Sequence, residues 1–288
     1  MLLVGDLGFG VVDAFAAELP DQFLNVGVAE QSMVGTAAGL AMTGRRVFVY
    51  SIGNFPTLRC LEQIRNDVCL HHLDVTVVSV GAGVAYGSLG YSHHAVEDMA
   101  VMRSLPGMRV LSPADPVEAR AAADLACASG GPLYVRLGKN GEPTLHQGVV
   151  DVTAPILMRT GSDLTLLATG SILGRALSVA DALDARGVSV RVLSCPTVKP
   201  ISEEALATAA LGTRGVVTLE EHSRAGGFGS AVLESLNADG GRTPVLVLGM
   251  PERPLHISGS QEYLRDLVGL SVEDLATRIE KFARSLSA

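Results

Sequence analysis

The chain has 288 residues, 48% of them hydrophobic and 18% charged, which is enough to bury a large core and suggests two domains. Its formal net charge of −8 argues against general binding to nucleic acids or to anionic membranes. The four cysteines form no Cys-X-X-Cys pair, as is typical of core residues in a reducing compartment. With no leader signal after Met1 and no apolar run that could span a bilayer, we expect a soluble, cytoplasmic protein.

Strand and helix patterns alternate along the first half of the chain. The expected strands are 2–4, 23–26, 46–51, 74–80, 109–111 and 133–137, and the expected helices are 11–19, a helix after Gly27, 57–71, 95–105 and 117–128. The strand at 74–80 is so apolar that it should be central and buried on both faces. Thr43-Gly44 is a helix stop signal, and Pro116 should lie in the first turn of its helix.

The second half restarts the same alternation. Strands are expected at 164–168, 188–193, 215–219 and 245–248, and helices at 171–186, after Gly229 as far as 236, at 261–268 and at 272–286. This pattern predicts an α/β fold of two doubly wound, mostly parallel-sheet domains. The domains are expected at 1–145 and 161–288, joined by a linker at 146–160.

One helix, following Gly27, is made almost wholly of small and apolar residues and is therefore expected to be buried nearly all round. It carries a single carboxylate, Glu30, in its first turn. An acid at this position can simply complement the helix dipole, which is worth some tenths of a kcal/mol. It can also be a catalytic carboxylate held in a dry interface, and the helix alone leaves both interpretations open.

A glycine-rich loop at 81–94 follows the central strand and ends in His93 and His94. Ligands gather at this edge of open parallel sheets, so the two imidazoles are candidates for a substrate site. Two solvated histidines in a loop are the simpler interpretation of the same residues.

Several ordered blocks resemble one family. They are 23–40, 48–52, 58–67, 90–98 (Gly-Tyr-Ser-His-His-Ala-Val-Glu-Asp), 105–119, 132–137 (Pro-Leu-Tyr-Val-Arg-Leu), 217–222 (Val-Thr-Leu-Glu-Glu-His) and 226–229 (Gly-Gly-Phe-Gly). Their succession resembles the C-terminal section of transketolases, which comprises a pyrimidine-binding domain and a C-terminal domain. A single such block is weak, but blocks in this order cover nearly the whole chain.

The resemblance implies thiamine diphosphate chemistry. It makes Glu30 the partner of N1′ of the cofactor's aminopyrimidine, which favours the tautomer that deprotonates the thiazolium. Phe55 is the candidate aromatic wall against the pyrimidine, and Asp6 matches a position close to the cofactor. The implied reaction moves a two-carbon ketol unit from a ketose, expected to be phosphorylated, to an aldehyde.

The resemblance also implies substrate residues. His93 matches a histidine suited to hydrogen-bond the oxygen that develops charge, and His94 is its neighbour. Arg136 matches an arginine that grips the substrate phosphate, although an arginine in a structural ion pair is the simpler interpretation. The Glu-Glu-His string at 220–222 is expected to be structural, because the C-terminal domain carries no core chemistry in this family.

Departures from the family shape the prediction. The sequence has no Gly-Asp-Gly motif with a later asparagine to hold the diphosphate and Mg²⁺, so we expect a separate subunit to supply them, with two copies of each. Leu89 stands where many members have an aspartate, Gly81 where a histidine is expected, and Tyr91 where proline is usual, so the donor remains open. The alternatives are the β subunit of a 2-oxoacid dehydrogenase or decarboxylase, and a non-catalytic homologous partner.

Overall fold

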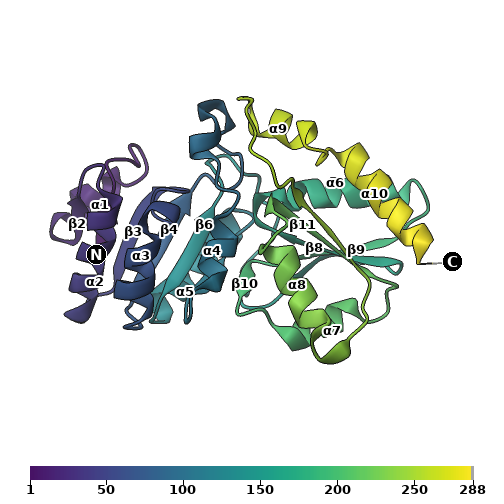
Figure 1. Ribbon diagram of the computed structural model, residues 1–288, viewed down its shortest axis with the longest axis horizontal. Helices are drawn as coiled ribbons and strands as arrows, with labels where there is room; N and C mark the ends of the chain where they lie inside the picture. The colour runs from purple at the N-terminus through teal and green to yellow at the C-terminus, as the bar shows by residue number, and fades with distance from the viewer. Residues whose placement is uncertain (287–288) are drawn as a thin grey trace.

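The computed structural model describes residues 1–286, without the side chain of Asp239. These residues form two sheets of mostly parallel strands, side by side, each with helices on both faces (Figure 1). The predicted α/β class with two doubly wound sheets is therefore confirmed. Within residues 1–286, no helix is both long and apolar enough to cross a membrane.

The first sheet has the strand order β10-β5-β6-β4-β3-β1-β2. Its strands are β1 (Leu2–Val4), β2 (Phe23–Asn25), β3 (Val47–Ile52), β4 (Val75–Val80), β5 (Arg109–Leu111), β6 (Leu133–Leu137) and β10 (Thr197–Lys199). The β-branched strand β4 lies in the middle, as predicted. β10, which belongs to the second half of the chain, pairs antiparallel with β5 and so ties the two halves together.

The helices of this half are α1 (Asp13–Glu18), α2 (Glu30–Met42), α3 (Leu61–Gln63), α4 (Asp98–Ser104) and α5 (Pro116–Ala128). Helices α2, α3 and α4 pack on one face of the first sheet, and α5 packs on the other. The predicted helix at 57–71 differs in detail, because it passes from a 3-10 turn at Leu58–Cys60 through α3 to a π-helix at Ile64–Cys69.

Local signals explain where two of these helices begin and end. α2 stops at Gly44, which has φ +85° and donates its N–H to the Ala41 carbonyl at 2.9 Å. α5 starts with Pro116 at its first position, and the Asp115 carboxylate accepts the Glu118 N–H at 2.9 Å. Both boundaries confirm the predictions made from the sequence.

The second sheet has the order β12-β11-β8-β9-β7, with β7 antiparallel to β9. Its strands are β7 (Ile156–Arg159), β8 (Leu164–Thr169), β9 (Val190–Ser194), β11 (Val216–Ser223) and β12 (Val245–Met250). Its helices are α6 (Leu173–Asp184), α7 (Glu203–Ala210), α8 (Phe228–Leu236), α9 (Gln261–Leu267) and α10 (Val272–Ser285). In Figure 1, α6 and α10 lie above this sheet and α7 and α8 below it. β7 lies within the range predicted as a linker.

The two halves share one hydrophobic core. A single cluster joins Met33 and Ile64 of the first half with Leu206 and Phe228 of the second. Each Å² of buried apolar surface stabilises the fold by about 25 cal/mol. The shared core therefore constrains the relative position of the two sheets.

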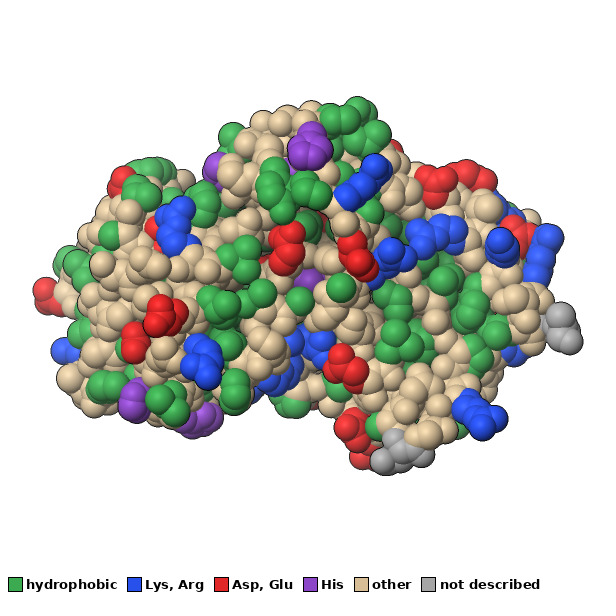
Figure 2. Space-filling model, viewed as in Figure 1, with side chains coloured by type: hydrophobic (Ala, Val, Ile, Leu, Met, Phe, Trp, Pro, Cys, Tyr) green, Lys and Arg blue, Asp and Glu red, His purple; other side chains and the backbone are tan. Residues whose placement is uncertain are grey.

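Ion pairs also hold the helices of the second domain together. Arg175 of α6 pairs with Glu262 of α9, and Arg186 just after α6 pairs with Glu273 of α10. Figure 2 shows mixed blue and red side chains over these helices.

Candidate functional site

The carboxyl ends of the parallel strands in the first sheet carry the candidate site. Gly5 and Asp6 follow β1, Glu30 follows β2, and Phe55 follows β3. The loop at 81–94 follows β4, and a further loop at 138–142 follows β6. Open parallel sheets bind ligands at this edge. The strand order alone therefore places Asp6, Glu30 and Phe55 at one edge of the sheet.

Glu30 lies at the start of α2 and is only 1% exposed. Its Oε1 accepts a hydrogen bond from the Ser51 hydroxyl of β3 at 3.2 Å. A Cβ on Gly5 would lie 3.3 Å from the same oxygen, so the backbone after β1 closes over the carboxylate. The carboxylate is therefore enclosed by the backbone that follows β1 and by the side chain of Ser51 in β3.

Arg59 occupies the other side of this carboxylate. Its Nη1 donates to Glu30 Oε2 at 2.6 Å, and its guanidinium lies 4.6 Å from the centre of the Phe55 ring. The Phe55 ring in turn meets the His93 ring edge-on, with 5.3 Å between the centroids. Arg59, which the sequence alone did not single out, thus joins Glu30 to Phe55, and Phe55 in turn contacts His93.

Asp6 lies at the rim of this group. It is exposed and has φ 56°, a left-handed conformation that aspartate tolerates better than most residues. Its carboxylate accepts a hydrogen bond from the Asn25 amide at 3.0 Å, and its N–H donates to Asn25 Oδ1 at 3.1 Å. These bonds hold the turn after β1 beside Gly5 and Glu30.

His94 points into the protein. It is 1% exposed, and its ring meets the Tyr91 ring edge-on at 6.0 Å. Burial lowers the pKa of His94, outweighing the opposing influence of Glu221, so the imidazole is neutral at physiological pH. Its buried Nε2 has no hydrogen-bond partner among the described residues. The partly exposed neighbour His93 is the member of the pair that reaches the Phe55 ring.

Arg136 lies apart from Glu30, between the two domains. It is 2% exposed, and its Nε donates to Asp98 Oδ2 at 2.7 Å while Nη2 donates to the carbonyls of Ala95 and Glu221. Burial opposes ionisation of Asp98, but the guanidinium outweighs it and holds the pKa of Asp98 below its usual value. Nε and Nη2 of Arg136 are therefore engaged within the protein in this arrangement, and its predicted role as a phosphate ligand stays a prediction.

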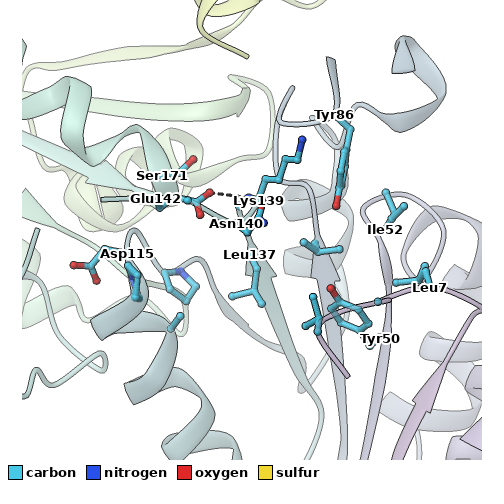
Figure 3. A pocket seen from close by; sticks show the side chains of 18 of the residues that line it. Leu7, Tyr50, Ile52, Tyr86, Asp115, Leu137, Lys139, Asn140, Glu142 and Ser171 are labelled. Carbon is cyan, nitrogen blue, oxygen red and sulfur yellow. Dashed lines mark hydrogen bonds between the residues drawn. The ribbon is translucent and has the colours of Figure 1, made fainter. Parts of the chain in front are cut away.

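A cavity of about 580 Å³ opens at the same sheet edge but on the other face of β3 (Figure 3). Tyr50 and Ile52 line it, whereas Ser51 between them faces Glu30, because neighbouring side chains alternate along a strand. Its basic lining residue is Lys139, whose ammonium lies 5.4 Å from the centre of the Tyr86 ring. Sequence reasoning missed Lys139, although its place just after β6 was a signal.

Tyr86 fills the space above Gly81, where the family pattern has a histidine. A Cβ on Gly81 would come within 2.2 Å of the Tyr86 ring, and Gly81 has φ +93°. Burial, together with the nearby Glu142 carboxylate, raises the pKa of Tyr86. The neutral phenol therefore takes the place that a side chain at position 81 would occupy.

No group of three or more His, Cys, Asp or Glu side chains in residues 1–286 could hold a metal ion. The acidic string Glu220, Glu221 and His222 at the end of β11 is buried and paired within the protein. Glu220 accepts the N–H groups of Phe228 and Gly229 at the start of α8, and burial raises its pKa to about 8.

One face of α2 contradicts the expectation of a helix buried nearly all round. Ser32, Thr36 and Gly39 are exposed along it, because no element of the described chain covers this end of the sheet. Nearby loops add exposed apolar side chains, among them Phe9 at 80% and Val28 at 74%. Figure 1 shows α1, α2 and β2 together at this free end of the molecule.

Comparisons with known proteins define the family. Residues 2–142 match the pyrimidine-binding domain of transketolase, and residues 153–275 match the transketolase C-terminal domain. The chain therefore belongs to the transketolase family, and this membership implies dependence on thiamine diphosphate.

Its relatives include separately encoded subunits. The chain is 35% identical over 275 residues to one subunit of an apulose-4-phosphate transketolase of Phocaeicola vulgatus, covering 94% of this chain and 86% of the relative. It is 35% identical over 274 residues to a 6-deoxy-6-sulfo-D-fructose transketolase subunit of a Clostridium species, covering 92% and 82%. A solved split-gene transketolase, described as an inactive β4 tetramer, superposes with a TM-score of 0.87 at 35% identity over 100% of this chain and 92% of that one.

Proposed function

We propose that this chain is the small subunit of a two-component, thiamine diphosphate-dependent transketolase. It would transfer a two-carbon ketol unit from a ketose to an aldehyde acceptor. The proposed donor is a ketose phosphate. The observation that carries the proposal is the contact chain from buried Glu30 through Arg59 and Phe55 to His93. Relatives that are named as transketolase subunits and match nearly the whole chain support it.

The residues around Glu30 fit the aminopyrimidine of the cofactor. The Arg59 guanidinium is planar, carries N–H donors, lies over the Phe55 ring and donates to Glu30. The cofactor's aminopyrimidine would also need a ring contact with Phe55 and a hydrogen bond with Glu30. We therefore infer that Arg59 occupies the position of the aminopyrimidine in this structure. When bound, the cofactor supplies a nucleophilic thiazolium carbon and an electron sink for the carbanion left by C–C cleavage.

Within this proposal, each residue of the chain has a limited task. Glu30 holds a proton at the pyrimidine nitrogen, and the Ser51 hydroxyl orients the carboxylate by bonding its other oxygen. Phe55 fixes the plane of the ring, and Asp6 holds the turn that closes over Glu30. His93 donates to the substrate oxygen on which charge develops, while neutral His94 is its buried neighbour and packs against Tyr91.

We assign substrate phosphate binding to Lys139 in place of Arg136. Lys139 lies at the mouth of a cavity of about 580 Å³, and its ammonium is a compact charge suited to a phosphate. The Nε and Nη2 groups of Arg136 already donate to Asp98 and to two carbonyls, and the side chain is only 2% exposed. The cavity also offers Asn140 and Ser171 as polar groups for sugar hydroxyls.

A partner subunit would complete the site. The exposed side of α2 and the apolar residues Phe9, Val11 and Val28 lie at the free end of the sheet that carries Glu30. Apolar surface of this kind marks protein interfaces. The partner would hold the diphosphate and Mg²⁺, and two copies of each subunit would place each cofactor between chains.

The test is reconstitution of this chain with the diphosphate-binding subunit, in the presence of thiamine diphosphate and Mg²⁺. We expect ketol transfer from a ketose phosphate to an aldehyde by the complex, and none by either chain alone. Decarboxylation of 2-oxoacids without ketol transfer would instead assign the chain to the 2-oxoacid dehydrogenase type. A complex that assembles and shows neither reaction would make the chain a non-catalytic partner.

A further inference from the structure

The loop that carries His93 is closed at its base. Gly83 and Ala95 exchange two backbone hydrogen bonds, from Gly83 N–H at 2.9 Å and from Ala95 N–H at 2.8 Å. The Ala95 carbonyl also accepts a bond from Arg136 Nη2 at 2.7 Å. His93 lies only two residues before this closure, so the position of the closure fixes the position of the imidazole.

Glu221 reaches this base from the other domain. It is the sixth residue of β11, is 3% exposed, and accepts the Val84 N–H at 2.7 Å through Oε1. Gly83 has φ +64°, and a Cβ there would lie 2.4 Å from the same oxygen. The backbone of the loop and the carboxylate therefore approach as closely as a glycine allows.

The C-terminal domain touches the loop at a second point. The Gly259 N–H donates to the Gly87 carbonyl at 3.2 Å. A Cβ on Gly87 would lie 2.3 Å from Leu264 Cδ1 and 2.8 Å from the Gly259 carbonyl oxygen. Both contacts are made by the segment that leads into α9 and by α9 itself, so the loop is held from its base and from its middle.

The Glu221 carboxylate is itself fixed. Arg265 Nε donates to its Oε2 at 2.7 Å, and the Gln261 amide donates to Oε2 at 3.0 Å. Arg265 is only 6% exposed, so this ion pair is shielded from water and holds one geometry. Glu221 is thus fixed to Arg265 and Gln261 of its own domain while it accepts the Val84 N–H of the loop. The position of the C-terminal domain therefore determines the position of the loop.

We propose that Glu221 is a positioning residue: it uses the C-terminal domain as a fixed support that holds the His93 loop in register with Phe55 and Glu30. The proposal gives the C-terminal domain a task in the reaction, although that domain contributes no group to the cofactor contacts. The kinetic part rests on the proposed transketolase function, whereas the structural part does not.

The structural part is tested by hydrogen exchange on the full chain, read by mass spectrometry over residues 83–95. In Glu221→Ala we expect the Val84 amide to exchange about 10- to 100-fold faster, since a hydrogen bond to a charged group is lost. The matched control is Glu262→Ala, which removes an exposed carboxylate from the same Arg265 without touching the loop. Equal exchange in wild type and Glu221→Ala, or equal acceleration by the control, overturns the proposal.

Glu221→Gln decides the question if the alanine variant does not fold. Its amide keeps an oxygen for the Val84 N–H but loses the charge opposite Arg265, so we expect exchange to rise by about tenfold. Unchanged exchange in this variant also overturns the proposal.

The kinetic part uses the reconstituted complex with fructose 6-phosphate, or whichever screened ketose turns over. Misplacement of His93 should lower kcat/KM for the donor by up to about 100-fold in Glu221→Ala, with partial rescue in Glu221→Gln. Exchange of the cofactor C2 proton should stay unchanged, because Glu30 is not displaced. An equal loss of C2 exchange would show a general structural defect and overturn the positioning role. A complex without any ketol transfer would refute the proposed function while leaving the hydrogen-exchange result to decide the positioning role.

Discussion

Arg59 should compete with the cofactor for Glu30 and Phe55. Removing it in Arg59→Ala frees both groups, which it holds by a 2.6 Å ion pair and a stacking contact at 4.6 Å. The Arg59 side chain is 43% exposed, so solvent screening limits the ion pair to about 0.2–1 kcal/mol. The stacking contact adds about 0.5–1 kcal/mol. Together they predict that about 0.7–2 kcal/mol opposes binding of the pyrimidine, or about 3- to 30-fold in affinity.

Calorimetric titration of the full chain with thiamine measures this effect, because thiamine carries the aminopyrimidine without the diphosphate. We expect Arg59→Ala to bind thiamine more tightly than wild type by that factor. Arg65→Ala is the matched control, since Arg65 lies further along the same helical segment and its Nη1 donates to Asn66 Oδ1 instead of to Glu30. Weaker binding by Arg59→Ala would show that the arginine assists the cofactor instead of standing in its place.

Two further predictions concern the substrate and the interface between domains. Lys139→Ala should raise KM about tenfold or more for phosphorylated donors and leave KM for unphosphorylated ones unchanged, and equal changes for both would remove the phosphate role. His222 is fully buried with its Nε2 accepting the Ala100 N–H, and burial lowers its pKa from 6.5 to about 4. Because the folded pKa is the lower one, the stabilisation is present above pH 6.5 and is lost as pH falls through about 4, in total about 3 kcal/mol. Denaturant titrations at pH 7 and pH 4 should show this loss in wild type and a smaller one in His222→Gln, and identical losses would contradict the assignment.

Local sequence signals predicted the parts of the fold that depend on few residues. Gly44 ends α2 and Pro116 lies at the first position of α5, and both signals depend on residues within a few positions. The central place of β4 followed from its continuous apolar run, which suits only a strand covered on both faces. The helix left two interpretations of Glu30 open, and its enclosure by Gly5 and Ser51 provides the dry position that a catalytic carboxylate requires. The catalytic role itself stays a prediction.

Features that depend on distant residues could not be predicted in this way. Arg136 is paired with Asp98 and with carbonyls from two domains. In the sequence, an arginine at the end of a strand looks the same whether it forms a structural ion pair or binds a phosphate. Arg59 meets Glu30 only because a helical segment after β3 crosses the start of α2. The pairing of β10 with β5 joins residues that are more than eighty positions apart. The short helix α7 was overlooked, although the Ser202 cap before two glutamates was a local signal.

The role of Glu30 is tested most directly by the exchange of the cofactor's C2 proton for deuterium in the reconstituted complex. Glu30→Gln keeps the size of the side chain and one oxygen for the Ser51 hydroxyl, but it cannot hold the shared proton as a carboxylate does. We predict that this variant assembles with its partner and loses C2 exchange by about 100-fold or more. Exchange at the wild-type rate in an assembled complex would contradict the proposed function of the site.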